Sequence, residues 1–280
     1  MTTVVEAPAP TGKPPVSEEQ RVRAARRRSR LKNLGWRIAG YVFVLGLWQF
    51  ASGRFMSERL LPAPTTVFRT FGELWDSGKV PGAFADTLTR IGIGFTLAFL
   101  VGTAVGVLMQ NRWLNGFFRD AVTIGITTPG LIWALITAII FGNRPAGPLL
   151  AILLTTFAVI SVNVAEGVKS LPKDLIDMAT AFDVGVVRRN RQIVLPHLMP
   201  FIFTGIRYGF SLAWKVTVLT EVFSASSGIG FEMRTATQLF RLPEFLTWIL
   251  AFYVFALFLE KVVLEQIERR FFGWRRSVTT

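Results

Sequence analysis

Long apolar runs are the feature that most constrains what this chain can fold into. Its 280 residues are 51% hydrophobic and only 18% charged, whereas a soluble domain carries nearer a quarter of charged residues. Apolar runs of roughly 20 residues recur along the chain, and an α-helix needs this length to cross the hydrocarbon core of a bilayer. Strands of a membrane barrel would instead alternate apolar and polar residues in stretches of about ten. The sequence therefore predicts an all-α, polytopic membrane protein.

The apolar runs predict about six transmembrane helices, at 34–51, 86–109, 117–141, 148–166, 198–222 and 245–263. A short amphipathic helix is expected around 65–76, after Pro62 and Pro64, and another short helix before Pro243. Proline and charge dominate residues 1–33, which have no apolar stripe to bury, so they are predicted to form a disordered basic tail. The transmembrane domain is expected to cover 34–276, and 277–280 to form a short C-terminal tail.

The basic residues are distributed unevenly between the two sides of these spans. With the N-terminus inside, the segments 21–37, 110–119, 167–196 and 264–280 carry 19 Lys and Arg residues, against 7 in the outer segments. Such an excess marks cytoplasmic loops, so both termini are predicted to be cytoplasmic. The net charge of +13 then follows from topology, and no nucleic-acid partner is expected. The basic tail is expected to contact anionic membrane lipid.

Residue types that support catalysis or metal binding are scarce. The chain has no cysteine and one histidine, His197, which excludes a cysteine-based metal site or nucleophile. It has no G-x-x-x-x-G-K-[ST] loop to hold the phosphates of ATP, and no Ser-His pair or cluster of His, Asp and Glu on one face. We therefore expect a subunit that is not an enzyme and that binds no metal or cofactor itself.

One compact polar segment, "DMATAFDVGVVRRNRQIVLP" (177–196), lies between the fourth and fifth predicted spans, on the cytoplasmic side. Ser170 and the following Leu-Pro-Lys-Asp predict the start of a short helix. On a helical wheel, one narrow apolar stripe then contains Leu175, Met178, Ala179, Phe182 and Val186. Such a stripe can lie in the lipid interface, pack on the chain's own helices, or dock on another protein. The residues alone leave these three alternatives open.

This segment resembles the "EAA" loop of binding-protein-dependent ABC transporter permeases. Asp177, Met178 and Ala179 occupy the E-A-A positions, and the closing I-x-L-P motif is matched at Ile193, Leu195 and Pro196. Asp183 stands where the family usually has glycine, and Gly185 follows two residues later, so the turn belongs to one of these two. The segments "LPAPTTVFRT", "GIRYGFSLAWKVTVLTEVF" and "ERRFFGWRR" are similar to the sulfonate, taurine and nitrate branch of this family.

The resemblance implies a permease subunit of an ABC importer in the bacterial inner membrane. It further implies a homodimer, two cytoplasmic ATPase subunits that hold ATP and Mg, and an extracytoplasmic solute-binding protein. The substrate would be a small polar or anionic solute such as a sulfonate, taurine or nitrate. The short cytoplasmic helix would be the coupling helix that docks on the ATPase. The residues implied in coupling are Leu175, Asp177, Met178, Ala179, Phe182, Asp183, Gly185, Ile193, Leu195 and Pro196.

The fifth predicted span carries Arg207, Lys215 and Glu221, and ionisable groups at membrane depth usually face a cavity or a partner. Either Lys215 lines the translocation path and attracts an anion, or Lys215 or Arg207 forms an ion pair with an acidic residue: Glu221, Glu166 or Glu260. Trp133 and Trp214 are further candidates for the path. The alternative function is a self-sufficient secondary carrier that uses Arg207, Lys215 and Glu221, although such carriers usually show an internal repeat that is not evident here.

Overall fold

The computed structural model describes residues 18–55, 57–58, 60–264 and 266. They divide into two compact units, one up to Pro64 and one from Thr65 on, and each is described by itself. Every regular element among the described residues is a helix, which confirms the all-α class. Residues 1–17, the short tail 277–280 and the motif "ERRFFGWRR" lie outside the described residues.

The first unit contains one long helix, α1 (Glu18–Ala51). Its C-terminal part is the expected span 34–51, but the helix also includes residues 18–33, which the sequence predicted to be disordered. Glu, Gln, Ala, Arg, Leu and Lys dominate this stretch, and they are strong helix formers even where no apolar stripe exists. After α1, the Ser52 hydroxyl donates to the Leu61 carbonyl at 2.7 Å and the Trp48 indole to the Pro62 carbonyl at 3.1 Å.

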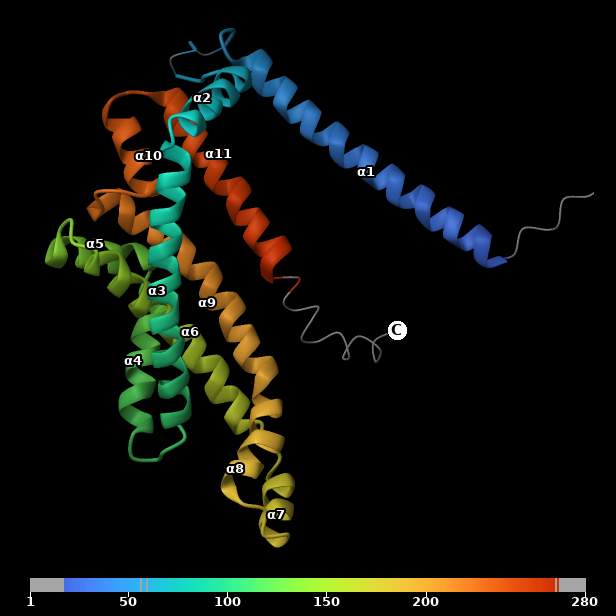
Figure 1. Cartoon of the computed structure of the whole chain (residues 1–280), viewed down its shortest axis with the longest axis vertical. Coiled ribbons are helices and arrows are strands. Elements are labelled where there is room, and N and C mark those ends of the chain that lie inside the picture. Colours follow the sequence, from blue (N-terminus) through green and yellow to red (C-terminus); the bar gives the residue numbers. More distant parts are fainter. Residues whose placement is uncertain (1–17, 56, 59, 265, 267–280) are drawn as a thin grey trace, which may run out of the picture. The chain divides into compact units, whose positions relative to one another are not determined.

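The second unit is a bundle of helices (Figure 1). In chain order its helices are α2 (Pro64–Asp76), α3 (Lys79–Leu108), α4 (Asn115–Thr127), α5 (Gly130–Phe141), α6 (Ala146–Lys169), α7 (Lys173–Ala181), α8 (Val186–Arg189), the π-helical turn η1 (Asn190–Val194), α9 (Leu195–Ser224), α10 (Ile229–Gln238), α11 (Leu242–Phe258) and the π-helical turn η2 (Leu259–Leu264). The amphipathic helix expected around 65–76 is confirmed as α2.

Four helical segments are long and apolar enough to cross a membrane: 79–108, 146–169, 186–224 and 242–262. The span expected at 117–141 is not one straight helix: α4 and α5 together are long and apolar enough for a broken span or a re-entrant loop, and they are bent by 98° relative to each other. The bend follows from Pro129, since a residue before proline avoids the helical region and Thr128 is extended with ψ 119. With this pair counted once, the described residues give up to five such spans. The sixth expected one, 34–51, is helical but does not meet the same criteria.

Helix α6 is the centre of the second unit, with α3 and α9 packed along it. Gly102 and Gly106 allow α3 to approach closely, because a Cβ on either would lie 2.7 Å from a carbonyl oxygen of α6. The Ser161 hydroxyl of α6 adds a hydrogen bond to the Gly102 carbonyl at 3.0 Å. Small residues spaced by four are typical of close helix packing in membranes, and here they serve packing within the bundle.

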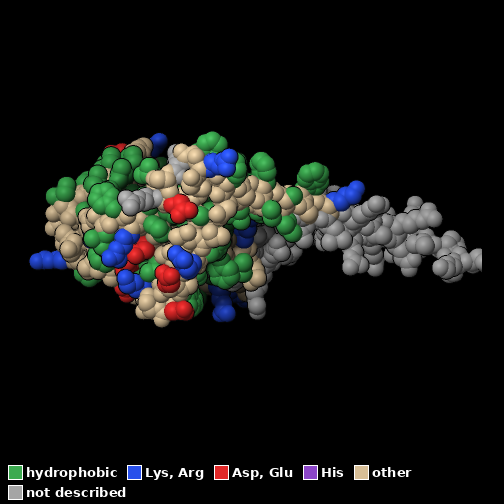
Figure 2. All heavy atoms as spheres, turned by 90° about the horizontal axis from the view of Figure 1, so that it is seen from above, with side chains coloured by type: hydrophobic (Ala, Val, Ile, Leu, Met, Phe, Trp, Pro, Cys, Tyr) green, Lys and Arg blue, Asp and Glu red, His purple; other side chains and the backbone are tan. Residues whose placement is uncertain are grey.

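A second core forms where α2, α3, α9, α10 and α11 meet. It consists of Leu74, Val80, Ala83, Val218, Ile229, Met233 and Trp248. Outside the cores, large apolar side chains are exposed on most helices, and Figure 2 shows them on one end of the molecule, with acidic and basic side chains interspersed. Exposed apolar surface on this scale is expected of helices that face lipid or another subunit.

Candidate functional site

The polar segment after α6 forms one end of the second unit. Figure 1 shows α7 and α8 at this end and α10 at the other, with α9 running between them. Two candidate sites therefore lie at opposite ends of the same helix, and a third group of candidate residues lies along it.

The N-cap of helix α7 lies two residues after the predicted cap, Ser170. Pro172, extended with ψ 123, is its N-cap, and Asp174 lies in its first turn, where the helix dipole favours an acid. Ser170 is instead the C-terminal cap residue of α6. Its hydroxyl donates to the Gly167 carbonyl at 2.9 Å and lies 3.0 Å from Nε2 of His197. The prediction that Ser170 caps the short helix is therefore wrong, because its side chain is used to close the preceding helix.

Helix α7 ends in a left-handed turn at Asp183, which has φ 51. The backbone N–H of Asp183 donates to the Thr180 carbonyl at 3.0 Å, and that of Val184 to the Ala179 carbonyl at 2.8 Å. This pair of bonds is the Schellman termination of a helix. Gly185 has φ −53 and precedes α8, so Asp183 makes the turn, and aspartate tolerates it better than most residues.

The apolar stripe of α7 faces away from the chain, with one exception. Leu175, Met178 and Val186 are exposed, Phe182 is 77% exposed, and Val187 next to the stripe is 82% exposed. Ala179 is only 1% exposed, so it packs α7 onto its own chain and is not part of the outward surface. Asp177 is exposed as well. The stripe is thus an apolar surface that nothing in the described part of the chain covers.

The I-x-L-P residues lie where the segment enters α9. Ile193 is half-buried in η1, while Leu195 and Pro196 are exposed in the first turn of α9. Pro196 has no N–H to donate to the preceding turn, and the helix widens there to a π-helical turn. The chain remains helical from Val186 to Ser224, so the I-x-L-P motif accompanies a local widening of the helix and not a break in it.

At the far end of α9, Glu221 is completely buried and fully hydrogen-bonded. Arg90 Nη1 donates to its Oε1 at 2.6 Å, the Thr87 hydroxyl lies 3.0 Å from both carboxylate oxygens, and the Gly230 N–H donates to Oε2 at 3.0 Å. Arg90 also donates to the Ser227 carbonyl at 2.8 Å and to its hydroxyl at 2.6 Å. This cluster, the Arg90–Glu221 network, ties α3 to the turn between α9 and α10.

The network corrects the ion-pair alternative for Glu221, because its partner is Arg90 of α3 and not Lys215 or Arg207 of its own helix. Sequence reasoning missed Arg90, although a charge inside the otherwise apolar run 79–108 was the signal that could have found it. Gly228 is required beside the network: it has φ 102, and a Cβ there would collide with the Glu221 carboxylate.

The other candidates for the path lie along α5 and α9. Lys215 is exposed, and its Nζ lies 5.4 Å from the ring centroid of Trp214. Trp214 packs edge-on against Phe252 of α11, with centroids 4.9 Å apart. Arg207 is on an exposed part of α9, and Trp133 is half-buried in α5 with its indole nitrogen buried and unbonded.

The two remaining acidic candidates for an ion pair are also placed. Glu166 forms an ion pair with Lys169 at 3.1 Å, near the end of α6. Glu260 is exposed in η2. Neither has a contact with Lys215 among the described residues.

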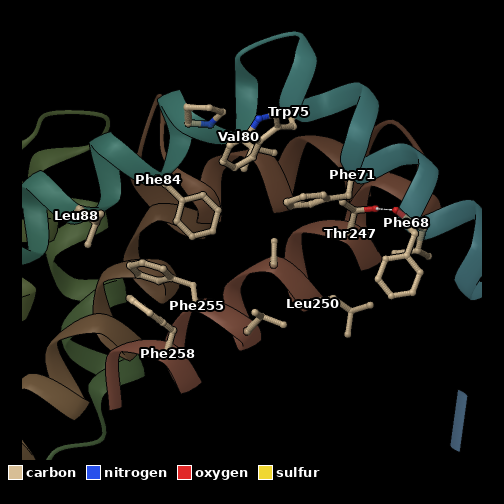
Figure 3. Close-up of a pocket in the computed structure, with 14 residues that line it drawn as sticks. Phe68, Phe71, Trp75, Val80, Phe84, Leu88, Thr247, Leu250, Phe255 and Phe258 are labelled. Carbon is tan, nitrogen blue, oxygen red and sulfur yellow. Dashed lines mark hydrogen bonds between the residues drawn. The ribbon is translucent and has the colours of Figure 1, made fainter. Parts of the chain in front are cut away.

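An apolar cavity of about 610 Å³ lies between α2, α3 and α11 (Figure 3). Phe71, Phe84 and Phe255 are among the rings that line it. The hydroxyl of Thr247 is bonded to the Val67 carbonyl at 3.2 Å and the Pro243 carbonyl at 2.7 Å, and the other polar group of a lining side chain is the indole N–H of Trp75. A cavity lined almost entirely by apolar side chains, with no charged one, does not suit a charged solute, so it is not a candidate for the translocation path.

Residues 94–272 match the model of the family described as "Binding-protein-dependent transport system inner membrane component". The chain belongs to this family. It is 26% identical over 259 residues to a putative aliphatic sulfonates transport permease protein, SsuC, of Bacillus subtilis (91% of this chain, 93% of the relative). It is 30% identical over 224 residues to the bicarbonate transport system permease protein CmpB of Synechococcus elongatus (75% and 80%). It is 28% identical over 204 residues to the nitrate import permease protein NrtB of Leptolyngbya laminosa (68% and 71%).

Solved structures of transporters share the fold. An inward-facing structure of the MetNI methionine ABC transporter matches with a TM-score of 0.58 and 17% identity, covering 69% of this chain and 95% of the matched chain. A crystal structure of an amino acid ABC transporter with histidines gives a TM-score of 0.58 and 14% identity, covering 72% of this chain and 96% of the matched chain. The family and its fold support the permease interpretation over that of a self-sufficient carrier, and membership makes the chain an inner-membrane component.

Proposed function

We propose that this chain forms the translocation path of an ABC importer together with a second copy of itself. In this proposal a separate cytoplasmic ATPase drives transport, with one subunit for each copy, and α7 transmits its motion. The single observation that carries the proposal is the exposed apolar stripe of α7, on a helix whose two ends are fixed by Pro172 and by the turn at Asp183.

The stripe has the properties of a docking surface. Leu175, Met178 and Phe182 project from a rigid helix at the tip of the bundle, and an apolar helix face fits a hydrophobic groove on a partner. Next to it, Val186, Arg188 and Arg191 line an open hollow that offers basic side chains to an acidic rim. Because the Lys and Arg distribution puts this end in the cytoplasm, the partner is a cytoplasmic protein.

The ATPase is the partner that the family supplies for this surface. The chain has no phosphate-binding loop of its own. In this proposal the partner binds ATP and Mg, and this chain carries out no catalysis. Helix α9 begins directly after the coupling segment and runs through the bundle, so displacement of α7 would reach the opposite end along one helix. An extracytoplasmic solute-binding protein would deliver the substrate there.

The substrate class follows from the relatives. The three named above are for aliphatic sulfonates, bicarbonate and nitrate, which are all small anions. We therefore propose a small anion as the solute of this chain, in the bacterial inner membrane, with both termini in the cytoplasm and the basic tail near anionic lipid.

The test is co-purification of the full chain with its candidate ATPase in lipid nanodiscs, with ATP hydrolysis as a second readout. Phe182→Glu puts a charge on the exposed stripe, where docking would leave it buried and unpaired, so we expect retention of the ATPase to be lost. Thr180→Glu is the matched control: Thr180 is an exposed residue of the same helix that lies off the stripe, so we expect it to bind normally. Equal binding of both variants would refute the docking surface, and a wild-type chain that retains no ATPase would refute the function.

A further inference from the structure

We infer that Lys215 is the residue of the translocation path that selects for a small oxyanion, with the hydroxyls of Ser211 and Tyr208 beside it. The inference rests on the proposed function and names the site within the path and its ligand class. It concerns the face of α9 that contains these three residues, called here the Lys215 face, on which Lys215 and Tyr208 are exposed and Ser211 is half-buried.

The position of Lys215 along α9 puts its charge at membrane depth. At 1.5 Å per residue it lies about 14 Å from Ser224 at one end of the helix and about 30 Å from Leu195 at the other. The segment 186–224 is one of the helices long and apolar enough to span a membrane. A lysine at this depth that is exposed on the single chain must face a water-filled cavity or a second subunit, because contact with lipid would be too costly.

The charge of Lys215 is not neutralised by the acidic residues that could have paired with it. Glu221, on the same helix, is enclosed by Arg90, Thr87 and Gly230, and Glu166 pairs with Lys169. Among the described residues, the interaction of Lys215 is with the ring of Trp214 at 5.4 Å. A cation over an aromatic face keeps its charge and its three N–H donors.

The Trp214 ring that contacts the Lys215 ammonium group is itself held in place by packing. It is held edge-on by Phe252 of α11, with an interplanar angle of 62°. The ammonium group therefore sits on a ring that two packed helices position, and it does not swing from an unsupported helix surface. Pre-positioned charge of this kind is what a path needs to bind an ion briefly without first ordering the side chain.

Hydroxyl donors share the face with the cation. Ser211 lies about 40° and Tyr208 about 20° from Lys215 around the helix axis, and Tyr208 is 60% exposed. An ammonium group with hydroxyls on the same helix face, one and two turns before it, suits an oxyanion, which accepts several hydrogen bonds and needs one positive charge. A cationic solute would be repelled, and a neutral one would gain little from the charge.

The test uses charged thiol reagents on a chain that naturally has no cysteine. Ser211→Cys would be treated with methanethiosulfonate ethylsulfonate, an anion, and with its trimethylammonium analogue, a cation, on the full chain in lipid nanodiscs with and without the ATPase and ATP. One unit charge at the distance of one helical turn changes a reaction rate by about tenfold. We therefore expect the anion-to-cation rate ratio to fall by at least about tenfold when Lys215→Met is added.

Matched variants separate the effect of the charge at position 215 from a structural effect of the substitution. Lys215→Arg should keep the rate ratio of the parent, and Lys169→Met, which removes an exposed lysine near the end of α6, should leave it unchanged. In transport assays, Lys215→Met should raise the KM for nitrate, bicarbonate or ethanesulfonate, whichever the system accepts. Lys215→Arg should have a KM close to that of the wild type.

Two results would overturn the inference: a cysteine at 211 that reacts with neither reagent in any state, or a rate ratio that Lys215→Met does not alter. Neither result depends on the proposed function, because retention of the ATPase by the wild-type chain is measured separately. If the ATPase binds but the ratio is unaltered, the permease stands and the anion site lies elsewhere.

Discussion

The two ends of α9 are built in opposite ways. At the end that joins α7 and α8, apolar side chains such as Phe182 and Val187 are exposed, and no other described part of the chain covers them. At the other end, Glu221 and the atoms around it are enclosed, and each charged oxygen has donors within 3.0 Å. The contrast is between an end whose polar groups are satisfied within the bundle and an end whose apolar surface is open, as the docking proposal requires.

The largest expected effect is a loss of stability on breaking the Arg90–Glu221 network, at the enclosed end of α9. Glu221→Ala would leave Arg90, whose side chain is 16% exposed, without its carboxylate, and loss of one partner of a buried pair typically costs about 3–5 kcal/mol. We expect a large fall in the thermal stability of the purified chain and in its yield from the membrane. Thermal unfolding in detergent, followed by a fluorescent or light-scattering signal, would measure it.

An exposed ion pair provides the control for this prediction. Arg69 and Glu73 of α2 lie 3.6 Å apart and are 74% and 68% exposed. Because pairs of this kind contribute little, Glu73→Ala should leave the unfolding temperature nearly unchanged. If Glu221→Ala and Glu73→Ala had the same unfolding temperature, the Arg90–Glu221 network would not stabilise the packing of α3 against the turn between α9 and α10.

A smaller effect is expected at the turn that ends α7. Asp183 has φ 51, a conformation that costs most L-residues about 1–2 kcal/mol. Asp183→Val should therefore loosen the end of α7 and weaken ATPase binding, whereas Asp183→Gly should bind at least as well as wild type. Binding affinity on immobilised nanodiscs would compare them. A valine variant with unchanged affinity would mean that the turn does not hold the docking surface.

The smallest expected effect is a change in the stability of the chain when the exposed stripe of α7 is altered. Phe182→Glu, which should abolish docking, should change the free energy of unfolding of the isolated chain by no more than about 0.5 kcal/mol, because exposed side chains rarely affect it further. Thermal unfolding alongside Glu221→Ala would show the difference directly. A marked loss of stability would mean that Phe182 belongs to the chain's own core.

Much of the fold could be read from the sequence because membrane spans are encoded locally. The helices at 146–169 and 195–224 were expected within three residues of their ends, since hydrophobic length selects them, whereas the helix at 79–108 begins seven residues before the expected span. The bend between α4 and α5 could not be read from hydrophobicity, which is continuous there, but Pro129 was its visible cause. The helical part of 18–33 was missed because helix propensity does not require an apolar stripe.

The candidate site was only partly predictable. The stripe with Met178 and Phe182 followed from helical periodicity, but the burial of Ala179 within it depends on which helix packs behind α7. The partner of Glu221 is Arg90, 131 residues away in the chain, and no local pattern pairs residues at that separation.

The sequence by itself determined the membrane class, most of the spans, the unequal distribution of basic residues and the apolar stripe of the coupling segment, because each depends on the order of residues along one helix. The structure resolved the local turn at Asp183, and only the tertiary structure decided that Ser170 lies beside His197 and that Glu221 pairs with Arg90. These two contacts depend on which side chains three-dimensional packing brings within hydrogen-bond distance. Burial then makes the pairing of Glu221 obligatory, since an unpaired charge in the bundle would cost more than the fold could tolerate.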